Sequence, residues 1–149
     1  MTTSPEIWAL TVTQPWAAAI ASGHKTVENR TWPTRHRGAL AIHAGRGFDY
    51  AAVGRDPNAP RVWAAIRTVQ RAAPGALDRG AIIAMATLAD CHPANDCCTP
   101  WAEQHPGIWH WALTDIHALD HPIPCRGRQR LWTLEPAHLA ALRTLADAA

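Results

Sequence analysis

Long hydrophobic runs are missing from this chain of 149 residues. The longest, such as residues 81–86, are far shorter than a membrane span. Residues 1–6 contain no basic segment followed by an apolar one, so the sequence predicts no secretory signal. Charged residues are few, at 17%, whereas 48% of the residues are apolar, which is typical of a globular rather than a disordered chain. We therefore expect a cytoplasmic monomer without membrane contacts, with one domain over residues 1–149.

Motifs of several protein classes are missing as well. No glycine-rich phosphate loop follows a predicted strand, which argues against nucleotide hydrolases and dinucleotide-binding folds. No serine, histidine and aspartate stand in a context typical of a hydrolase triad. The C-x2–4-C spacing of structural zinc sites is absent among the four cysteines, which are Cys91, Cys97, Cys98 and Cys125. Because no signal peptide indicates an oxidising compartment, we predict reduced thiols. Adjacent cysteines are expected to point in different directions, so we predict no metal site and no cofactor. The alternative is zinc, since Cys91-His92 and Cys97-Cys98 lie close together in the sequence.

Lysine is nearly absent, since Lys25 is the only one among 14 basic residues. A partly buried lysine can lose its proton usefully, whereas an arginine cannot. On the predicted strand 25–32, Glu28 and Arg30 share one face with Thr26, and twist at the start of the strand turns Lys25 toward the same opening. Glu28 is expected to stay ionised beside its two cationic neighbours. The alternative is chance, because a single lysine must lie somewhere.

Arginine is concentrated in two segments. Residues 24–37 hold four basic residues against one acid, and residues 125–130 hold three arginines and no acid. Such local patches attract phosphates even though the formal net charge is only +2. The alternative is that both segments are simply solvated loops.

Aromatic residues are used unevenly, with eight tryptophans but one phenylalanine and one tyrosine. Indole rings stack on nucleobases or fill protein cores. Trp16 and Trp32 flank the polar residues around Lys25, where stacking and packing are both open. Apolar surroundings predict core positions for four others, which are Trp63, Trp101, Trp111 and Trp132.

The order of predicted elements indicates an α+β fold. Strands are expected at 7–13, 25–32, 38–44, 80–91, 108–119 and 130–134, and helices at 15–22, 61–73 and 136–148. Strands separated by two or three helices favour a mixed β-barrel of about five to six strands over a βαβ array. We place the core within about residues 7–135, with His43 as a hydrogen-bonded core residue and 136–148 as a C-terminal helix.

Four segments resemble the ASCH (activating signal cointegrator homology) family, a relative of the PUA RNA-binding domains. Leu10–Trp16 resembles the family's opening SL-x-QPW, and Gly23–Arg30 matches its G-x-K-x-x-E-x-R signature at each position. Trp32–Ala44 resembles the continuation W-x-T-x-x-RG-x-L-x-I-x-A, and Pro122–Trp132 resembles P-I-x-x-[RK]-G-x-Q-x-L-W. The similarity runs in order from about residue 10 to residue 134.

The resemblance implies a PUA-like β-barrel whose cleft, beside the first helix, is lined by Lys25, Glu28 and Arg30. Family members are associated with RNA or DNA binding, and some bacterial relatives are ribonucleases or amidohydrolases acting on N4-acylated cytidine. In the amidohydrolase branch a threonine stands where this chain has Glu28. That departure favours binding over the same deacylation.

Two functional hypotheses follow, with a protein-interaction adaptor as a third. In the first, single-stranded RNA or DNA lies in a basic cleft, where Trp16 or Trp32 stacks a base and Glu28 or Gln129 reads its edge. Phosphate contacts would come from Lys25, Arg30, Arg35, Arg37, Arg126 and Arg128. In the second, the same cleft is a metal-independent ribonuclease or nucleoside amidohydrolase site. Lys25 and Glu28 would then transfer protons while Arg30 stabilises negative charge.

Overall fold

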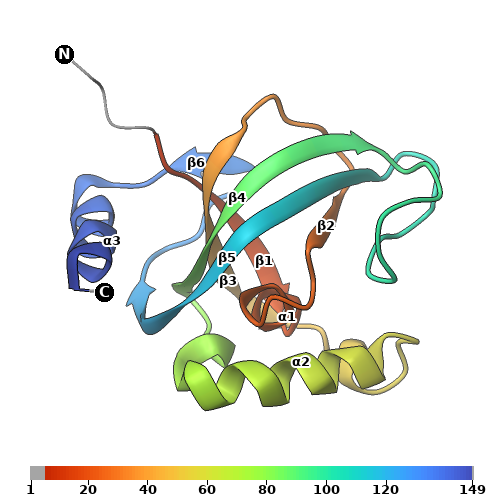
Figure 1. The fold of residues 1–149 in the computed structure, drawn as a ribbon, viewed down its shortest axis with the longest axis horizontal. Coiled ribbons are helices and arrows are strands. Elements are labelled where there is room, and N and C mark those ends of the chain that lie inside the picture. The colour runs from red at the N-terminus through yellow and green to blue at the C-terminus, as the bar shows by residue number, and fades with distance from the viewer. Residues whose placement is uncertain (1–5, 149) are drawn as a thin grey trace.

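The computed structural model describes residues 6–148 and contains one six-stranded sheet with three α-helices (Figure 1). The strands lie in the order β2-β5-β4-β3-β1-β6. Only β1 and β3 pair in parallel, and the other neighbours are antiparallel. The elements are β1 (Trp8–Gln14), α1 (Trp16–Ala21), β2 (Val27–Arg30), β3 (Gly38–Phe48), η1 (Tyr50–Val53), α2 (Ala59–Ala72), η2 (Pro74–Leu77), β4 (Ala81–Pro93), β5 (Trp109–Pro124), β6 (Leu131–Thr133) and α3 (Pro136–Ala148).

The predicted α+β class, with six strands and three helices, is confirmed, but the sheet does not close into a barrel. Within residues 6–148, the edge strands β2 and β6 do not pair with each other. They have only four and three residues, so each offers few backbone groups for a pairing that would close the sheet. Closure of the barrel was therefore predicted wrongly.

Helix α1 lies against the curled sheet and contacts β1, β3, β4 and β5 (Figure 1). Its sequence, WAAAIA, has buried small side chains at Ala17–Ala19, which let the helix approach the strands closely. The helix starts after Pro15 and is followed by Gly23, whose φ of +83° suits glycine at a helix end. Helix α2 packs on α1, and α3 covers the β6 end of the sheet through Leu142.

Several element boundaries differ from those predicted. β2 begins at Val27 rather than residue 25, β3 continues to Phe48, and β5 continues to Pro124. Residues 1–5, on which the absence of a secretory signal was judged, and residue 149 lie outside the described part of the chain. No helix within residues 6–148 is long and apolar enough to cross a membrane.

The tryptophan predictions hold for three of the four expected core residues. Trp101, Trp111 and Trp132 are buried. Trp63 is not, since it is 45% exposed on α2 and its indole nitrogen donates to the Val53 carbonyl at 3.0 Å. On an amphipathic helix, apolar neighbours in the sequence do not determine whether a side chain lies on the buried or the exposed face.

Candidate functional site

Lys25, Glu28 and Arg30 form a compact ion-pair network at the start of β2. Lys25 Nζ lies 3.2 Å from Glu28 Oε1, and Arg30 Nη2 lies 3.2 Å from Glu28 Oε2. Lys25 also donates to the Val27 carbonyl, and Arg30 donates to the Thr11 carbonyl at 2.6 Å. Lys25 is 2% exposed and Glu28 7%. The Lys25 side chain therefore points toward the same face of the strand as Glu28, as predicted.

The Glu28 carboxyl is held in its ionised form. Burial by itself raises its pKa, but the Lys25 ammonium, the Arg30 guanidinium and the Asn29 amide outweigh burial and leave the pKa below its ordinary value. The Asn29 amide donates to Oε1 at 3.0 Å. The position of Arg30 costs free energy, because its Nε is buried with no hydrogen-bond partner among residues 6–148.

A cavity of about 270 Å³ opens beside this network. Trp16 forms one wall, with its indole nitrogen donating to Asp49 at 3.0 Å and its ring edge-on to Trp101 at 6.4 Å. Trp101 and Glu103 come from the β4–β5 loop and line the same cavity. Asn29 fastens this loop, since its side chain donates to the Trp101 carbonyl and accepts from the Glu103 amide, both at 2.9 Å.

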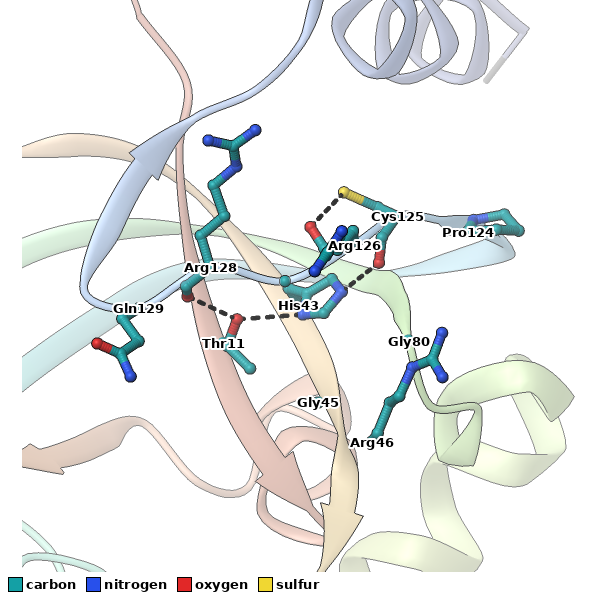
Figure 2. A pocket seen from close by; sticks show the side chains of 11 residues that line it. Thr11, His43, Gly45, Arg46, Gly80, Pro124, Cys125, Arg126, Arg128 and Gln129 are labelled. Carbon is teal, nitrogen blue, oxygen red and sulfur yellow. Dashed lines mark hydrogen bonds between the residues drawn. The ribbon is translucent and has the colours of Figure 1, made fainter.

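A larger cavity, of about 810 Å³, is also lined by Thr11 (Figure 2). Its floor is Thr11 on β1 and His43 on β3, which are register partners in the parallel pair. Its rim comes from the segment before β6, from the last part of β3 and from the residue before β4. Its exposed side chains are Arg46, Arg126, Arg128 and Gln129. The cavity is thus open to solvent along an arginine-rich rim.

His43 is a fully bonded core residue, as predicted. Its Nε2 donates to the Cys125 carbonyl at 2.6 Å, and its Nδ1 lies 3.2 Å from the Thr11 hydroxyl. Burial lowers the pKa of His43, and this effect exceeds the opposing effect of the Cys125 carbonyl. The imidazole therefore stays neutral and joins the Cys125–Gln129 segment to the sheet.

A third cavity, of about 390 Å³, shares lining residues with the other two. It shares Arg30 with the smaller cavity and Arg128 and Gln129 with the larger one, and Thr11 lines all three. We call the three cavities together the Thr11 groove. Trp32 and Arg130 complete its middle part, with the Arg130 guanidinium 5.1 Å from the centroid of the Trp32 ring.

Residues 10–120 match the family model of the ASCH domain. That match covers well over half of the chain. The chain belongs to the ASCH family.

Two relatives of this ASCH chain are Activating signal cointegrator 1 from Mus musculus, at 27% identity, and from Homo sapiens, at 26%. Each alignment spans 141 residues and covers 86% of this chain but 22% of the relative. This ASCH chain therefore spans about a fifth of the length of the curated relatives that it matches.

Crystal structures of ASCH from Zymomonas mobilis share the fold. The TM-score is 0.56 at 17% identity, over 94% of this chain and 95% of that one. A mutant form of the same protein gives 0.57, also at 17% identity, over 95% of this chain and 99% of that one. The predicted family and fold class are thus confirmed.

The ASCH structure brings together most, but not all, of the residues predicted for the site. The three cavities include seven of them, which are Trp16, Lys25, Arg30, Trp32, Arg126, Arg128 and Gln129, together with Glu28. Arg35 and Arg37 line none of these cavities. Arg37 instead lies 3.7 Å from Asp90, beside the start of β3.

Several groove residues were missed by sequence reasoning. Thr11, Arg46 and Arg130 lie on or next to strands whose pairing is not readable from composition. Trp101 was predicted to be core and is buried, yet it also lines the small cavity. Arg130 belongs to the basic segment 125–130, but it was not among the predicted phosphate contacts.

A separate cluster holds groups able to bind a metal ion. His92, Cys97, Cys98 and His110 each place one nitrogen or sulfur within 4.8 Å of the others. The expectation that adjacent cysteines point apart is wrong here, because both sulfurs face the same two imidazoles. The backbone at Cys98 has φ of +133°, which turns its side chain to the same side as that of Cys97.

Proposed function

We propose that this ASCH protein binds single-stranded RNA or DNA along the Thr11 groove. The observation that carries the proposal is the set of exposed arginines, Arg46, Arg126, Arg128 and Arg130, that line neighbouring cavities of the Thr11 groove. Guanidinium groups bind phosphate oxygens in a bidentate manner and remain charged at all physiological pH values. The ASCH family's association with nucleic acid supports the same proposal.

The groove also contains groups suited to a base. Gln129 is exposed between Arg128 and Arg130, where its amide offers both donors and an acceptor to a base edge. Trp16 is half-buried in the wall of the small cavity and is the better placed of the two candidate stacking residues. Trp32 already packs edge-on against Trp111 at 4.8 Å and carries Arg130 over its ring.

The Lys25 network supports a positioning role rather than proton transfer. Two of the three Lys25 donors are used by Val27 and Glu28. Glu28 already accepts from three donors, and its lowered pKa makes it a weak base. In the binding proposal, the network fixes the Arg30 guanidinium between the small and middle cavities.

One feature favours the alternative of an enzyme on a modified nucleoside. The small cavity of about 270 Å³ is close to the lower end of small-molecule sites. Polar side chains of Asn29, Asp56 and Asn58 line it beside Lys25. An N4-acylated cytidine is the substrate class to test there, with loss of turnover in Lys25→Ala as the expected result.

Fluorescence anisotropy with labelled single-stranded RNA and DNA at several salt concentrations tests the binding proposal. The groove variant is Arg126→Ala/Arg128→Ala, and the matched control is Arg67→Ala/Arg71→Ala, which removes two exposed arginines from α2. The groove variant is expected to bind more weakly, with a salt slope smaller by about 0.7 for each phosphate that the variant no longer binds. The control should match the wild type.

Equal weakening in both double variants would show a diffuse charge effect and would contradict binding in the groove. The same samples are followed for strand cleavage. Cleavage that is lost in Lys25→Ala would replace the binding proposal with a ribonuclease.

A further inference from the structure

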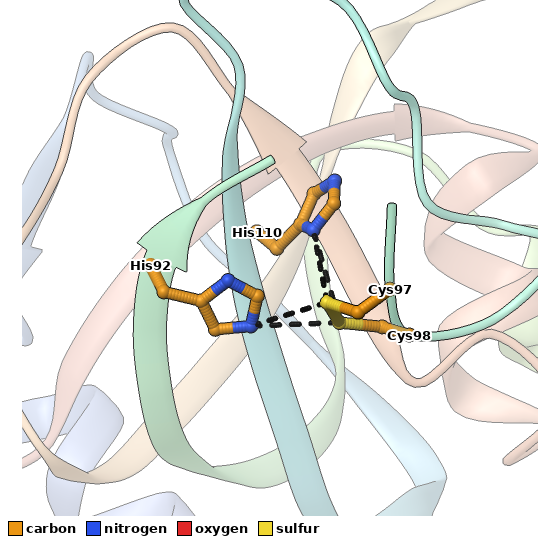
Figure 3. Close-up of side chains that lie close together, drawn as sticks. All are labelled: His92, Cys97, Cys98 and His110. Atoms are coloured by element: carbon orange, nitrogen blue, oxygen red, sulfur yellow. Dashed lines mark hydrogen bonds between the residues drawn. A yellow bond between two sulfur atoms is a disulfide. The ribbon is translucent and has the colours of Figure 1, made fainter. Parts of the chain in front are cut away.

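The second cluster lies at the loop end of the β4–β5 hairpin, beside the Thr11 groove but not among the residues that line it. His92 on β4 and His110 on β5 are cross-strand partners, with ring centroids 5.4 Å apart. The loop after β4 turns back and places the sulfurs of Cys97 and Cys98 against both rings (Figure 3). Four potential ligand atoms from two neighbouring strands and the loop that joins them therefore meet at one point.

Both imidazoles direct a lone pair toward the sulfurs. His110 Nε2 lies 2.6 Å from the Glu103 carbonyl, and His92 Nδ1 lies 2.9 Å from the Pro93 carbonyl. A carbonyl only accepts, so in the neutral rings these nitrogens carry the hydrogen and the opposite nitrogens carry the lone pair. A carbonyl bond on the distal nitrogen is typical of metal-binding histidines.

The opposite nitrogens are the ones that face the cysteines. His92 Nε2 lies 3.8 Å from Cys97 Sγ and 3.4 Å from Cys98 Sγ. His110 Nδ1 lies 3.9 Å and 3.8 Å from the same sulfurs. Each imidazole is thus within reach of an ion placed between the rings and the sulfurs.

In the structure Cys97 and Cys98 are joined by a disulfide (Figure 3), so the prediction of reduced thiols is wrong for this pair. Disulfide sulfurs carry no hydrogen, so the two imidazole lone pairs would then face them without a donor. A phosphine breaks the S–S bond, and one water molecule supplies the oxygen of the phosphine oxide and the two thiol hydrogens, which leaves two thiols at the same place. Two thiolates with two neutral imidazoles form the ligand set of a tetrahedral zinc site.

We propose that His92, Cys97, Cys98 and His110 bind one zinc ion in the reduced protein. Each thiol releases its proton to solvent as a Zn–S bond of about 2.3 Å forms, and the sulfurs separate to about 3.8 Å, as tetrahedral geometry requires. His110 is fully buried and Cys98 is exposed, so the ion enters from the side of Cys98. Four protein ligands leave no open position, which makes the site structural.

The zinc ion would fix one wall of the Thr11 groove. His110 binds the ion with one nitrogen and the Glu103 carbonyl with the other. The Glu103 amide is bonded to Asn29, which follows Glu28 on β2. Gln104 closes the loop further by accepting from the Asp96 amide at 2.9 Å and donating to the Cys97 carbonyl at 2.6 Å. The ion would therefore hold Trp101 and Glu103 beside the small cavity.

The test measures bound zinc in protein purified with tris(2-carboxyethyl)phosphine and without chelator. The site variants are Cys98→Ser and His110→Ala. The controls are His105→Ala, an exposed histidine of the same loop, and Cys91→Ser, whose thiol packs toward the core instead. Wild type and controls are expected to hold one zinc per chain, and the site variants to bind it at least about tenfold more weakly.

Cobalt titration of the reduced wild-type protein keeps the proposal testable if a site variant fails to fold. Thiolate-to-cobalt charge transfer together with tetrahedral ligand-field bands is the expected spectrum. A reduced wild-type protein that binds neither metal at micromolar concentrations would overturn the proposal. Full zinc retention in folded Cys98→Ser and His110→Ala would overturn it as well. Because no nucleic acid is present, these outcomes are independent of the proposed function.

Discussion

Glu28 sets how the Lys25 network responds to acid. Its pKa is held below the ordinary glutamate value of about 4.5, because Lys25, Arg30 and Asn29 outweigh the effect of burial. A carboxyl whose folded pKa is lowered stabilises the fold above the unfolded pKa, and this stabilisation disappears as the pH falls through the folded value.

Glu28→Gln is therefore expected to flatten the pH dependence of the unfolding free energy below about pH 4.5. At pH 7 the variant is expected to be less stable by about 3 kcal/mol, because Lys25 stays buried without its counter-charge. Urea denaturation at a series of pH values measures both effects. Asp120→Asn, which changes an exposed acid, is the control. If the unfolding free energy of Glu28→Gln falls with acid as steeply as that of the wild type, other carboxyl groups determine the pH dependence.

Gly127 is the glycine on which the larger cavity depends most directly. A Cβ built there would lie 2.7 Å from His43 Cε1, 2.9 Å from His43 Nδ1 and 2.9 Å from Thr11 Oγ1. His43 is buried and bonded, so it cannot move away cheaply. The main chain at position 127 must shift instead, and it carries Arg126 and Arg128 with it.

Gly127→Ala is expected to cost about 1–3 kcal/mol of unfolding free energy, as overpacking does, and to weaken nucleic-acid binding. Gly47→Ala is the matched control, because its added Cβ would meet only Thr13 Cγ2, at 3.9 Å. Thermal unfolding and anisotropy are compared for the two variants. Equal behaviour of both would contradict the close packing of Gly127 on His43.

Among the elements, α1 and η2 are joined by one buried side chain. Gln14 is fully buried, donates to the carbonyls of Ala76 and Asp78 at 2.8 Å and 2.9 Å, and accepts from the Ala18 amide at 2.9 Å. Every hydrogen bond to its side chain comes from backbone. This explains the glutamine of the QPW segment as a structural residue between two elements.

Gln14→Leu keeps the volume but leaves three backbone groups without partners. The expected loss of unfolding free energy is at least about 3 kcal/mol, at roughly 1–3 kcal/mol per unsatisfied group. Chemical denaturation measures it, and Gln70→Leu, on an exposed position of α2, controls for the loss of an amide. A loss below that of the control would mean that the three groups find other partners.

Local sequence patterns predicted the type of every strand and α-helix, because each element has its own periodicity or its own proline or glycine boundary. Strand lengths were less accurate where pairing, rather than pattern, extends a strand, as at the end of β5. The Lys25, Glu28 and Arg30 group was predictable because all three lie within six residues. The His92 and His110 pair was not, since it depends on the register between β4 and β5 and on a loop whose path no pattern gives.

For the whole molecule, the net charge predicts that nucleic-acid binding also depends on pH. The formal net charge of +2 counts nine histidines as neutral, so their protonation can raise it to at most +11. His43 is buried with a lowered pKa and stays out of this change. A more positive molecule attracts a polyanion more strongly.

Affinity for single-stranded RNA or DNA is therefore expected to rise as the pH falls from about 7.5 to 6, across the ordinary histidine range. The increase should disappear at high salt, where surface charges are screened. Anisotropy titrations at both pH values and two salt concentrations measure the effect. A pH response that survives high salt would indicate a specific titrating contact instead.

The position of β1 within the sheet has a consequence for biosynthesis. β1 pairs with β3 on one edge and, on the other, with β6, the last strand within residues 6–148. A chain leaving the ribosome therefore carries β1, with Trp8 and Leu10, along one open edge until Leu131–Thr133 has been translated. Open strand edges recruit other chains. C-terminal truncations that remove Leu131–Thr133 are thus expected to yield insoluble nascent products rather than a shorter working domain.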